Sequence, residues 1–478
     1  MANMNRRNFL RSGAATGFLA GTGVLSTLTS GRAFAANTSG YKALVCIFLK
    51  GGMDHADTVI PRDQASYDLL KSARPGLYGA YGVGSGSSSR DRANLLALNP
   101  TNAASFGSRQ FGLPAQLSGL QEIFEAGDLA IVGNVGPLIE PTTRSDLTRI
   151  GAQLPPRLFS HNDQQSTWMS LGVEGAQYGW GGAFADAALR SDSSLNPRYA
   201  MVSAGPNDVF LSGKEGRQFT TSAGGAQGVT LVDQPYVLGG ESRFNAARDL
   251  LDEYVSQTGY GETNLFARDF ARQSGNGVIN SRAYDVALES STPITTAFPA
   301  TSIGSQLRSV ANTISIQDKL DSNRQVFYVF MGGFDTHSGQ TNTLPGLQTA
   351  LSEAISAFRT SMVTQGKWND VTLFTMSEFG RTTIDNGDGT DHGWGGHHFV
   401  TGGSVAGKQI YGDIPTPDLD GESFTSTHGR LIPKVSVEQY AATLGSWFGL
   451  DAGELAAALP NLSNFSQKNL GFLGGATT

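Results

Sequence analysis

Tyr41–Leu49 reads Y-K-A-L-V-C-I-F-L, and the turn K-G-G follows at residues 50–52. An almost unbroken apolar run of this length is typical of a strand that is buried on both faces, as in the parallel sheet of an α/β fold. Asp54 stands just beyond the turn. The stretch therefore predicts a central strand with an acidic side chain past its carboxyl end.

Four other stretches have the same apolar character and predict further strands. They are Leu129–Gly133, Val326–Met331, Val371–Met376 and the shorter His398–Thr401. Asp335 and His337 follow the second of these strands, and Glu378 follows the third. Ligands of open α/β sheets bind beyond the carboxyl ends of the strands. We therefore expect these side chains and Asp54 to lie at one functional edge of the sheet.

Helical patterns alternate with the predicted strands. They cover Ala115–Ala126, Ser242–Val255, Thr263–Gln273, Gly304–Leu320, Leu347–Val363 and Val437–Phe448. This alternation predicts a doubly wound α/β fold, with a mostly parallel sheet and helices on both faces. Residues 191–240 are poor in helical pattern and rich in Gly, Ser and Thr, so we expect an inserted cap region there.

The first 35 residues have the pattern of a twin-arginine signal peptide. Asn5–Arg11 (N-R-R-N-F-L-R) carries the paired arginines, Ser12–Leu28 is mildly apolar, and Ala33-Phe34-Ala35 resembles a cleavage site. A membrane anchor is the alternative, but the apolar run is too short and too rich in Gly and Thr. We expect export in the folded state by the twin-arginine translocase, to the periplasm or beyond.

Composition excludes several classes of protein. The hydrophobic content of 39% is ample for the core of a single domain over residues 36–470, and residues 471–478 are expected to fray. A net charge of −7 without a basic stripe argues against nucleic-acid binding. No segment of the mature chain has the pattern of a membrane span. The single cysteine, Cys46, can form no internal disulfide and is expected to be buried.

A glycine-rich stretch, Gly380–Val400, gathers histidines. Three of the seven histidines in the chain, His392, His397 and His398, lie here beside Asp391. Neutral imidazoles together with carboxylates are suitable ligands for a divalent transition metal. The alternative is an ordinary glycine-rich turn. Because His397 and His398 are adjacent, we expect them to face opposite ways, so that one is a ligand and the other either supports the site or contacts the substrate.

The side chains at the strand ends each have a second interpretation. Asp335 and His337 are two residues apart, which points both the same way in an extended segment, but an exposed loop pair is the alternative. Asp54 either binds a second metal or caps the next turn. Glu378 is expected to take part in the metal site. Arg381 either contacts a phosphate- or sulfate-like oxyanion or forms a salt bridge with Glu378.

Ser160-His161-Asn162-Asp163 precedes a predicted helix. Serine is a preferred N-cap, and Asp163 in the third position after it resembles a capping box. The functional interpretation is that the Ser160 hydroxyl lies in the positive potential of a helix N-terminus and acts as a nucleophile, with His161 beside it. The two interpretations are compatible.

Taken together, these motifs resemble a family of twin-arginine-exported bacterial proteins of unknown function, grouped with the alkaline phosphatase/sulfatase superfamily. The segments that carry the resemblance are the leader, Gly51–Asp54, Ser160–Asp163, Gly332–His337, Ser377–Thr382 and Gly389–His398. The resemblance implies a doubly wound α/β fold that binds one or two divalent metals through Asp and His. It also implies a Ser, Thr or formylglycine nucleophile that acts on phosphate or sulfate esters.

Two positions depart from the superfamily pattern. By resemblance, Asp54 is a first metal aspartate, Asp335 with His337 belongs to a second site, and Asp391-His392-Gly393 is the Asp-His-Gly metal motif. After the Val371–Met376 strand, however, the superfamily has Ser-Asp-His-Gly, whereas this chain has Ser-Glu-Phe-Gly. The sulfatase motif Cys/Ser-x-Pro-x-Arg is also missing.

The sequence therefore predicts an exported metal-dependent hydrolase of phosphate or sulfate esters. Its cofactor would be one or two divalent ions, with zinc as the first expectation and manganese, iron or calcium as alternatives. Its substrate would be a small-molecule or polysaccharide ester. The alternative function is a non-catalytic envelope binding protein on the same scaffold, which the departure at residues 378–379 favours.

Overall fold

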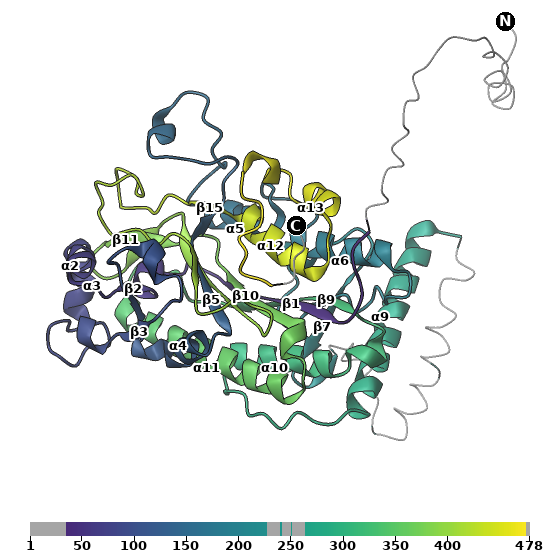
Figure 1. Cartoon of the computed structure of the whole chain (residues 1–478). Coiled ribbons are helices and arrows are strands. Elements are labelled where there is room, and N and C mark those ends of the chain that lie inside the picture. Colours follow the sequence, from purple (N-terminus) through teal and green to yellow (C-terminus); the bar gives the residue numbers. More distant parts are fainter. Residues whose placement is uncertain (1–34, 227–239, 241–249, 251–262, 475–478) are drawn as a thin grey trace, which may run out of the picture. The chain divides into compact units, whose positions relative to one another are not determined.

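In the computed structural model of the chain, the sheet is built around β1 (Lys42–Leu49) (Figure 1). Its two neighbours, β9 (Arg324–Met331) and β10 (Val371–Met376), run parallel to it and pair with it over most of its length. All of its residues except Lys42 are buried. The central strand predicted from the apolar run is confirmed, and so is the burial of Cys46 within it.

The main sheet has ten strands in the order β14-β5-β13-β10-β1-β9-β6-β7-β8, with β15 also paired to β5. The remaining bounds are β5 (Leu129–Gly136), β6 (Met201–Ser203), β7 (Gln218–Ser222), β8 (Gly225–Ala226), β13 (Gly396–Thr401), β14 (Ile410–Gly412) and β15 (Val435–Ser436). β13 runs antiparallel to β10 and β5, and β8 runs antiparallel to β7. The other pairs are parallel, which confirms the predicted mostly parallel sheet.

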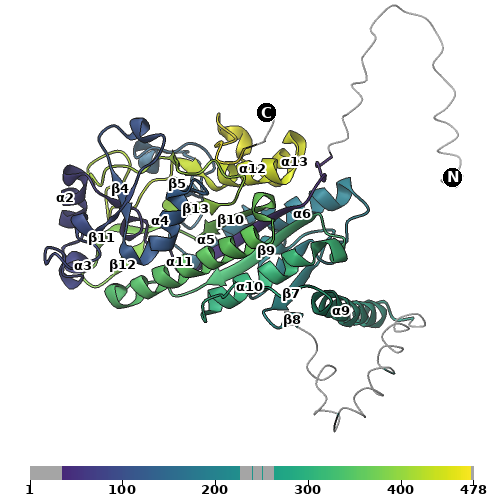
Figure 2. The same cartoon turned by 60° about the horizontal axis from the view of Figure 1, so that its bottom comes forward.

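Helices cover both faces of this sheet (Figures 1 and 2). One face packs against α4 (Ser118–Glu125), α10 (Ser302–Ser315) and α11 (Gln340–Thr364), and the other against α5 (His161–Ser170), α6 (Trp180–Ser191), α12 (Val437–Phe448) and α13 (Ala452–Ala458). In β1, Val45 and Ile47 belong to the first core and Cys46 and Phe48 to the second. This alternation is why the run has to be apolar at nearly every position.

Smaller elements surround the sheet. Two minor sheets consist of β2 (Ile60–Pro61), β3 (Leu96–Leu98) and β4 (Phe111–Leu113), and of β11 (Arg381–Asp385) and β12 (Thr390–His392). The other helices are α2 (Gln64–Ala73), α3 (Pro75–Ala80) and α9 (Leu265–Glu289), which begins near the start of a predicted helix and is longer. None of the helices among the described residues is long and apolar enough to cross a membrane.

The structure describes residues 35–226, 240, 250 and 263–474, which fall in one compact unit. The predicted signal peptide lies outside the described residues except for its last one, and the predicted helix Ser242–Val255 lies outside except for residue 250. At the other end, the expected fraying is wrong for residues 471–474. Phe472 and Leu473 are buried, and Leu473 pairs with Val405.

The stretch 191–240 differs from the predicted insertion in its described part. β6 pairs with β9, and β7 pairs with β6, so both strands continue the central sheet. These residues are therefore part of the scaffold and not a cap over it. The strands are short, three and five residues, which explains why no long apolar run indicated them.

The parallel strands β1, β9 and β10 end at the same edge of the sheet. Gly51, just after β1, joins the three strand ends. Its N–H donates to Glu378 at 2.9 Å, and its carbonyl accepts from Arg381 at 3.1 Å. Its backbone has a φ of +121°, and a Cβ atom there would lie 2.2 Å from the backbone nitrogen of Asp335. Glycine is thus required both by conformation and by space.

Replacing Gly51 with alanine tests this junction. Gly127→Ala is the control, because Gly127 also has a positive φ but nothing lies within 4 Å of its Cβ position. We expect it to lower the free energy of unfolding by about 1–2 kcal/mol. Gly51→Ala should lower the free energy of unfolding by clearly more, because the backbone at Asp335 has to shift. Urea unfolding of both variants measures the difference. Equal losses would show that the close approach to Asp335 has no energetic weight.

Candidate metal centre

Three side chains from separate elements converge beyond the strand ends. They are His161, the first residue of α5, Asp335, which follows β9, and His392, the last residue of β12. One donor atom of each lies within 4.8 Å of the others. Two imidazoles and a carboxylate at this spacing are a donor set that a divalent metal ion can bind.

Both histidines in this group are oriented from behind. His392 Nδ1 lies 2.8 Å from the carbonyl oxygen of Phe159, and His161 Nδ1 lies 2.8 Å from a carboxylate oxygen of Glu378. Because these oxygens accept, each Nδ1 carries a proton, and in the neutral ring Nε2 then has a free lone pair. The two Nε2 atoms lie 3.3 and 3.5 Å from the Asp335 carboxylate. Metal-binding histidines are commonly oriented by such an outer partner.

His337 contacts two members of this group. Its Nε2 lies 2.8 Å from His392 Nε2 and 3.3 Å from Asp335, while its Nδ1 lies 3.1 Å from Asp391. Two imidazole nitrogens so close repel unless a proton or a cation lies between them. His337 is therefore a fourth candidate donor, and Asp391 is placed to orient its ring.

Glu378 lies behind the group and not within it. Its carboxylate is fully buried, and Oε1 accepts from Gly51 N–H at 2.9 Å, from Gln165 at 3.0 Å and from His161. The hydrogen bond with Glu378 raises the pKa of His161 above its ordinary value, against the effect of burial. We expected a metal ligand here, but the geometry makes Glu378 a residue that orients one.

The environment of Arg381 agrees with neither interpretation of the sequence. Arg381 is fully buried and donates a hydrogen bond to Asp335 at 2.8 Å. Its salt-bridge partner is thus Asp335 and not Glu378, and its burial leaves no access for an oxyanion. Its Nε donates to the Thr390 hydroxyl, and Nη2 donates to the Thr390 carbonyl. Burial works to raise the pKa of Asp335, but the hydrogen bond and charge of Arg381 outweigh it and lower that pKa. Arg381 therefore keeps Asp335 ionised.

Asp54 does not join the group either. Both of its carboxylate oxygens accept from Arg74, at 2.6 and 2.9 Å, and one also accepts from Gln340 at 2.6 Å. It also caps a short 3-10 helix by accepting from the N–H groups of Ala56 and Asp57. Its capping interpretation is correct, and its ligand interpretation is wrong, because Arg74 and Gln340 already bind its oxygens.

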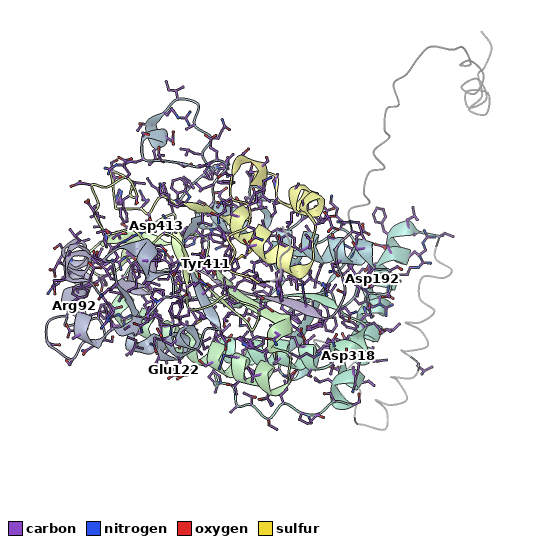
Figure 3. All side chains as sticks on the ribbon, viewed as in Figure 1. Arg92, Glu122, Asp192, Asp318, Tyr411 and Asp413 are labelled. Atoms are coloured by element: carbon purple, nitrogen blue, oxygen red, sulfur yellow. The ribbon has the colours of Figure 1, made fainter. Side chains whose placement is uncertain are left out.

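The two arginines beside the strand ends are buried, in contrast to charged residues at the surface. Arg74 and Arg381 are 1% and 0% exposed, and both are paired with carboxylates. Arg92, Glu122 and Asp318, labelled in Figure 3, are exposed on the surface. Leaving a buried arginine without its partner is costly, so Arg74 and Arg381 help to fix the geometry beside the strand ends.

The adjacent histidines of β13 are both buried and lie outside the group. His397 accepts from the N–H of Asn134 at 3.0 Å and packs edge-on against His55. His398 packs against Trp168 and Tyr440. The structure thus gives them roles in the core, and the expectation that one of them joins His392 is not met.

Ser160 directly precedes His161, but its hydroxyl makes no capping bond. Instead it donates to the Asp163 carboxylate at 2.8 Å. The predicted capping box is therefore wrong. Phe159 before it has a left-handed backbone, with φ +73°, which turns its carbonyl to His392.

Two aromatic and cationic neighbours of the group were not predicted. Phe379 packs against both His161 and His392, with ring centroids 4.9 and 4.6 Å away. Arg430 donates from Nε to the backbone carbonyl of His392 at 2.8 Å. In the sequence, Phe379 is recognisable only as a departure from the superfamily pattern, and no motif indicates Arg430.

A family model described as a protein of unknown function (DUF1501) matches residues 41–463, so the chain belongs to this family. No curated protein has a matching sequence. Among solved structures, Ps i-CgsB aligns with a TM-score of 0.33 and 9% identity, over 88% of this chain and 72% of that chain. Its complex with k-i-k-neocarrahexaose gives a TM-score of 0.31, with the same identity and coverage.

A further solved chain comes from work on the metabolism of multiple glycosaminoglycans by Bacteroides thetaiotaomicron. It aligns with a TM-score of 0.33 and 9% identity, over 88% of this chain and 74% of that chain. At these TM-scores the likeness carries no conclusion about activity.

The buried histidines predict sensitivity to acid. Burial lowers the pKa of His398 to about 3 and that of His55 to about 4, whereas a free imidazole titrates near 6.5. Between these values the unfolded chain binds protons that the folded chain does not, so stability falls as the pH drops below 6.5. His398→Phe should reduce this slope by up to about 1.4 kcal/mol per pH unit.

Urea unfolding between pH 7 and pH 4 measures the effect. His428→Phe is the matched control, because His428 is exposed. An unchanged slope in His398→Phe would show that His398 titrates normally in the folded protein.

Proposed function

We propose that the protein is an exported, metal-dependent hydrolase of phosphate or sulfate esters. The observation that supports this best is the convergence of two imidazole Nε2 atoms, from His161 and His392, on the Asp335 carboxylate. Each ring is held at Nδ1 by an acceptor, Glu378 for His161 and the Phe159 carbonyl for His392, so both Nε2 atoms are prearranged for a cation.

The donor set fits one divalent ion. Imidazole and carboxylate ligands suit zinc, with manganese, iron or calcium as alternatives. His337 is placed to add a further nitrogen. Phe379 stands where the resembled superfamily has a metal-binding histidine, and its ring packs against both His161 and His392. An apolar ring offers no ligand, so we propose a single ion.

The residues around the group have distinct tasks. A bound divalent ion would supply Lewis acidity toward a phosphoryl or sulfuryl oxygen. Arg381 keeps Asp335 anionic, and Glu378 keeps the proton of His161 on Nδ1. Ser160 is the candidate nucleophile, and Asp163, which already accepts its hydrogen bond, would take its proton.

The cellular setting belongs to the same proposal. The twin-arginine motif at Asn5–Arg11 supports export by the twin-arginine translocase to the periplasm or the medium. There the substrate would be a small-molecule or polysaccharide ester.

A non-catalytic envelope binding protein is the second candidate. Phe379 favours it, because this ring removes a ligand that a two-metal hydrolase would need. Such a protein would bind an exported partner or a polysaccharide and turn over no ester.

Replacing His392 with alanine tests the hydrolase. Metal analysis of protein purified from its export compartment should find about one ion per chain in the wild type and almost none in His392→Ala. Turnover of a panel of phosphate and sulfate esters should fall roughly a thousandfold or more. Glu122→Ala, at an exposed residue of α4, is the control and should change neither quantity.

The outcomes separate the two candidates. Folded wild-type protein without metal would contradict the metal centre. Metal without turnover of any ester, together with a tight partner, would favour the binding protein.

Glu378→Gln tests the orientation of His161. Glutamine retains a similar shape but lacks the charge that holds the Nδ1 proton, so metal affinity should fall about 10–100-fold. Competition with a chelator measures this affinity. Glu438→Gln is the control, because Glu438 is also a buried glutamate: it lies in α12 and accepts a hydrogen bond from Asn461. Equal metal affinities of Glu378→Gln and Glu438→Gln would show that Glu378 does not support the metal site.

A further inference from the structure

Besides the proposed metal ion, a cationic side chain that binds the anionic group would assist hydrolysis of a phosphate or sulfate ester, and Arg381 cannot supply it. Each of its three guanidinium nitrogens donates to the protein: Nε to Thr390, Nη1 to Gly51 and Asp335, and Nη2 to the Thr390 carbonyl. Its side chain is also 0% exposed. A substrate oxygen has no access to this side chain.

Arg430 is held beside the same group by a short hairpin. Phe424 pairs with Leu431 across the hairpin, and Gly429 accepts a hydrogen bond from the backbone of Thr383 in β11 at 3.0 Å. Arg430 Nε donates to the carbonyl of His392 at 2.8 Å. The guanidinium is therefore fixed next to a candidate metal ligand by backbone contacts.

Phe159 holds the other side of this guanidinium. The Cζ atom of Arg430 lies 4.1 Å from the centroid of the Phe159 ring, a stacked cation–π contact. The carbonyl of Phe159 accepts from His392 Nδ1. Arg430 and Phe159 thus both contact His392, one at its backbone and the other at its ring.

One end of Arg430 remains available. Its Nη1 lies 3.4 Å from His428, and its Nη2 makes no hydrogen bond to any residue in the described part of the chain. The side chain is half-buried, and burial lowers its pKa, whereas the charge of Asp391 acts to raise it. A guanidinium stays protonated at any ordinary pH, so Nη2 offers two charged N–H donors.

We propose that Arg430, stacked on Phe159, binds the anionic oxygens of the substrate and makes the site selective for phosphoryl or sulfuryl groups. This inference rests on the proposed function. Asp335 and Asp391 give the mouth of the site negative charge, because both are more than 40% exposed. An anionic substrate needs a compensating cation there, and the planar fork of arginine matches phosphate and sulfate oxygens.

Binding of inorganic phosphate and inorganic sulfate tests Arg430 directly. Calorimetry on the full mature chain, both zinc-loaded and treated with chelator, gives the dissociation constants. Arg430→Gln should weaken binding about 10–100-fold, as expected for a lost charge-assisted contact. Arg149→Gln is the matched control: it removes an exposed arginine that pairs with Asp146 and Glu140, and it should change binding less than about twofold.

Metal content distinguishes binding from positioning. Arg430→Gln should retain the wild-type zinc content, and Arg430→Lys should recover only part of the anion affinity, because lysine lacks the fork. Loss of zinc in Arg430→Gln would mean that Arg430 merely positions His392, and would overturn the inference. Unchanged phosphate and sulfate affinity, or no anion binding by the wild type, would also overturn it.

Failure of the proposed function gives a different result. A wild-type chain that binds no zinc and cleaves no ester contradicts the hydrolase, yet the difference in phosphate affinity between wild type and Arg430→Gln is still measurable. A chain that binds zinc and cleaves esters, with equal affinity in both forms, contradicts the role of Arg430 alone.

Discussion

The buried carboxylate of Glu378 is the interaction on which the site depends. One of its oxygens accepts from the Gly51 N–H after β1 and from His161 and Gln165 of α5. A fully buried carboxylate is tolerated only when its charge is met by donors. The ends of β1 and β10 and the start of α5 are therefore held together, and the contact with Glu378 orients the His161 ring beside Asp335.

A second layer of buried charge supports the first. Arg381 donates hydrogen bonds to both Asp335 and the Gly51 carbonyl. Arg74 likewise donates to Asp54 and to the backbone of β11. Rearranging either arginine would leave an unpaired charge in the protein interior, which is strongly unfavourable. The donor atoms are thus prearranged by the protein, so the proposed binding of an ion would need little reorganisation.

More of the scaffold than of the candidate site could be predicted from the sequence. Apolar runs indicated β1, β5, β9 and β10, because a strand buried on both faces must be apolar throughout. Asp335, His337 and His392 were expected together, and the structure brings them together. Asp54 and Arg381 were misassigned because their partners, Arg74 and Asp335, lie 20 and 46 residues away. Histidine clustering in sequence likewise says nothing about which imidazoles a strand buries.

The strand order also bears on how the chain reaches its native state. β1 is the first strand of the sheet to be synthesised, but its two neighbours begin only at Arg324 and Val371. Until then an apolar segment with unpaired backbone groups has no sheet to join, which is a typical starting point for aggregation. Pairing of β1 with its two neighbours therefore has to wait until most of the chain has been translated, and residues 42–49 are a segment prone to aggregation during that interval.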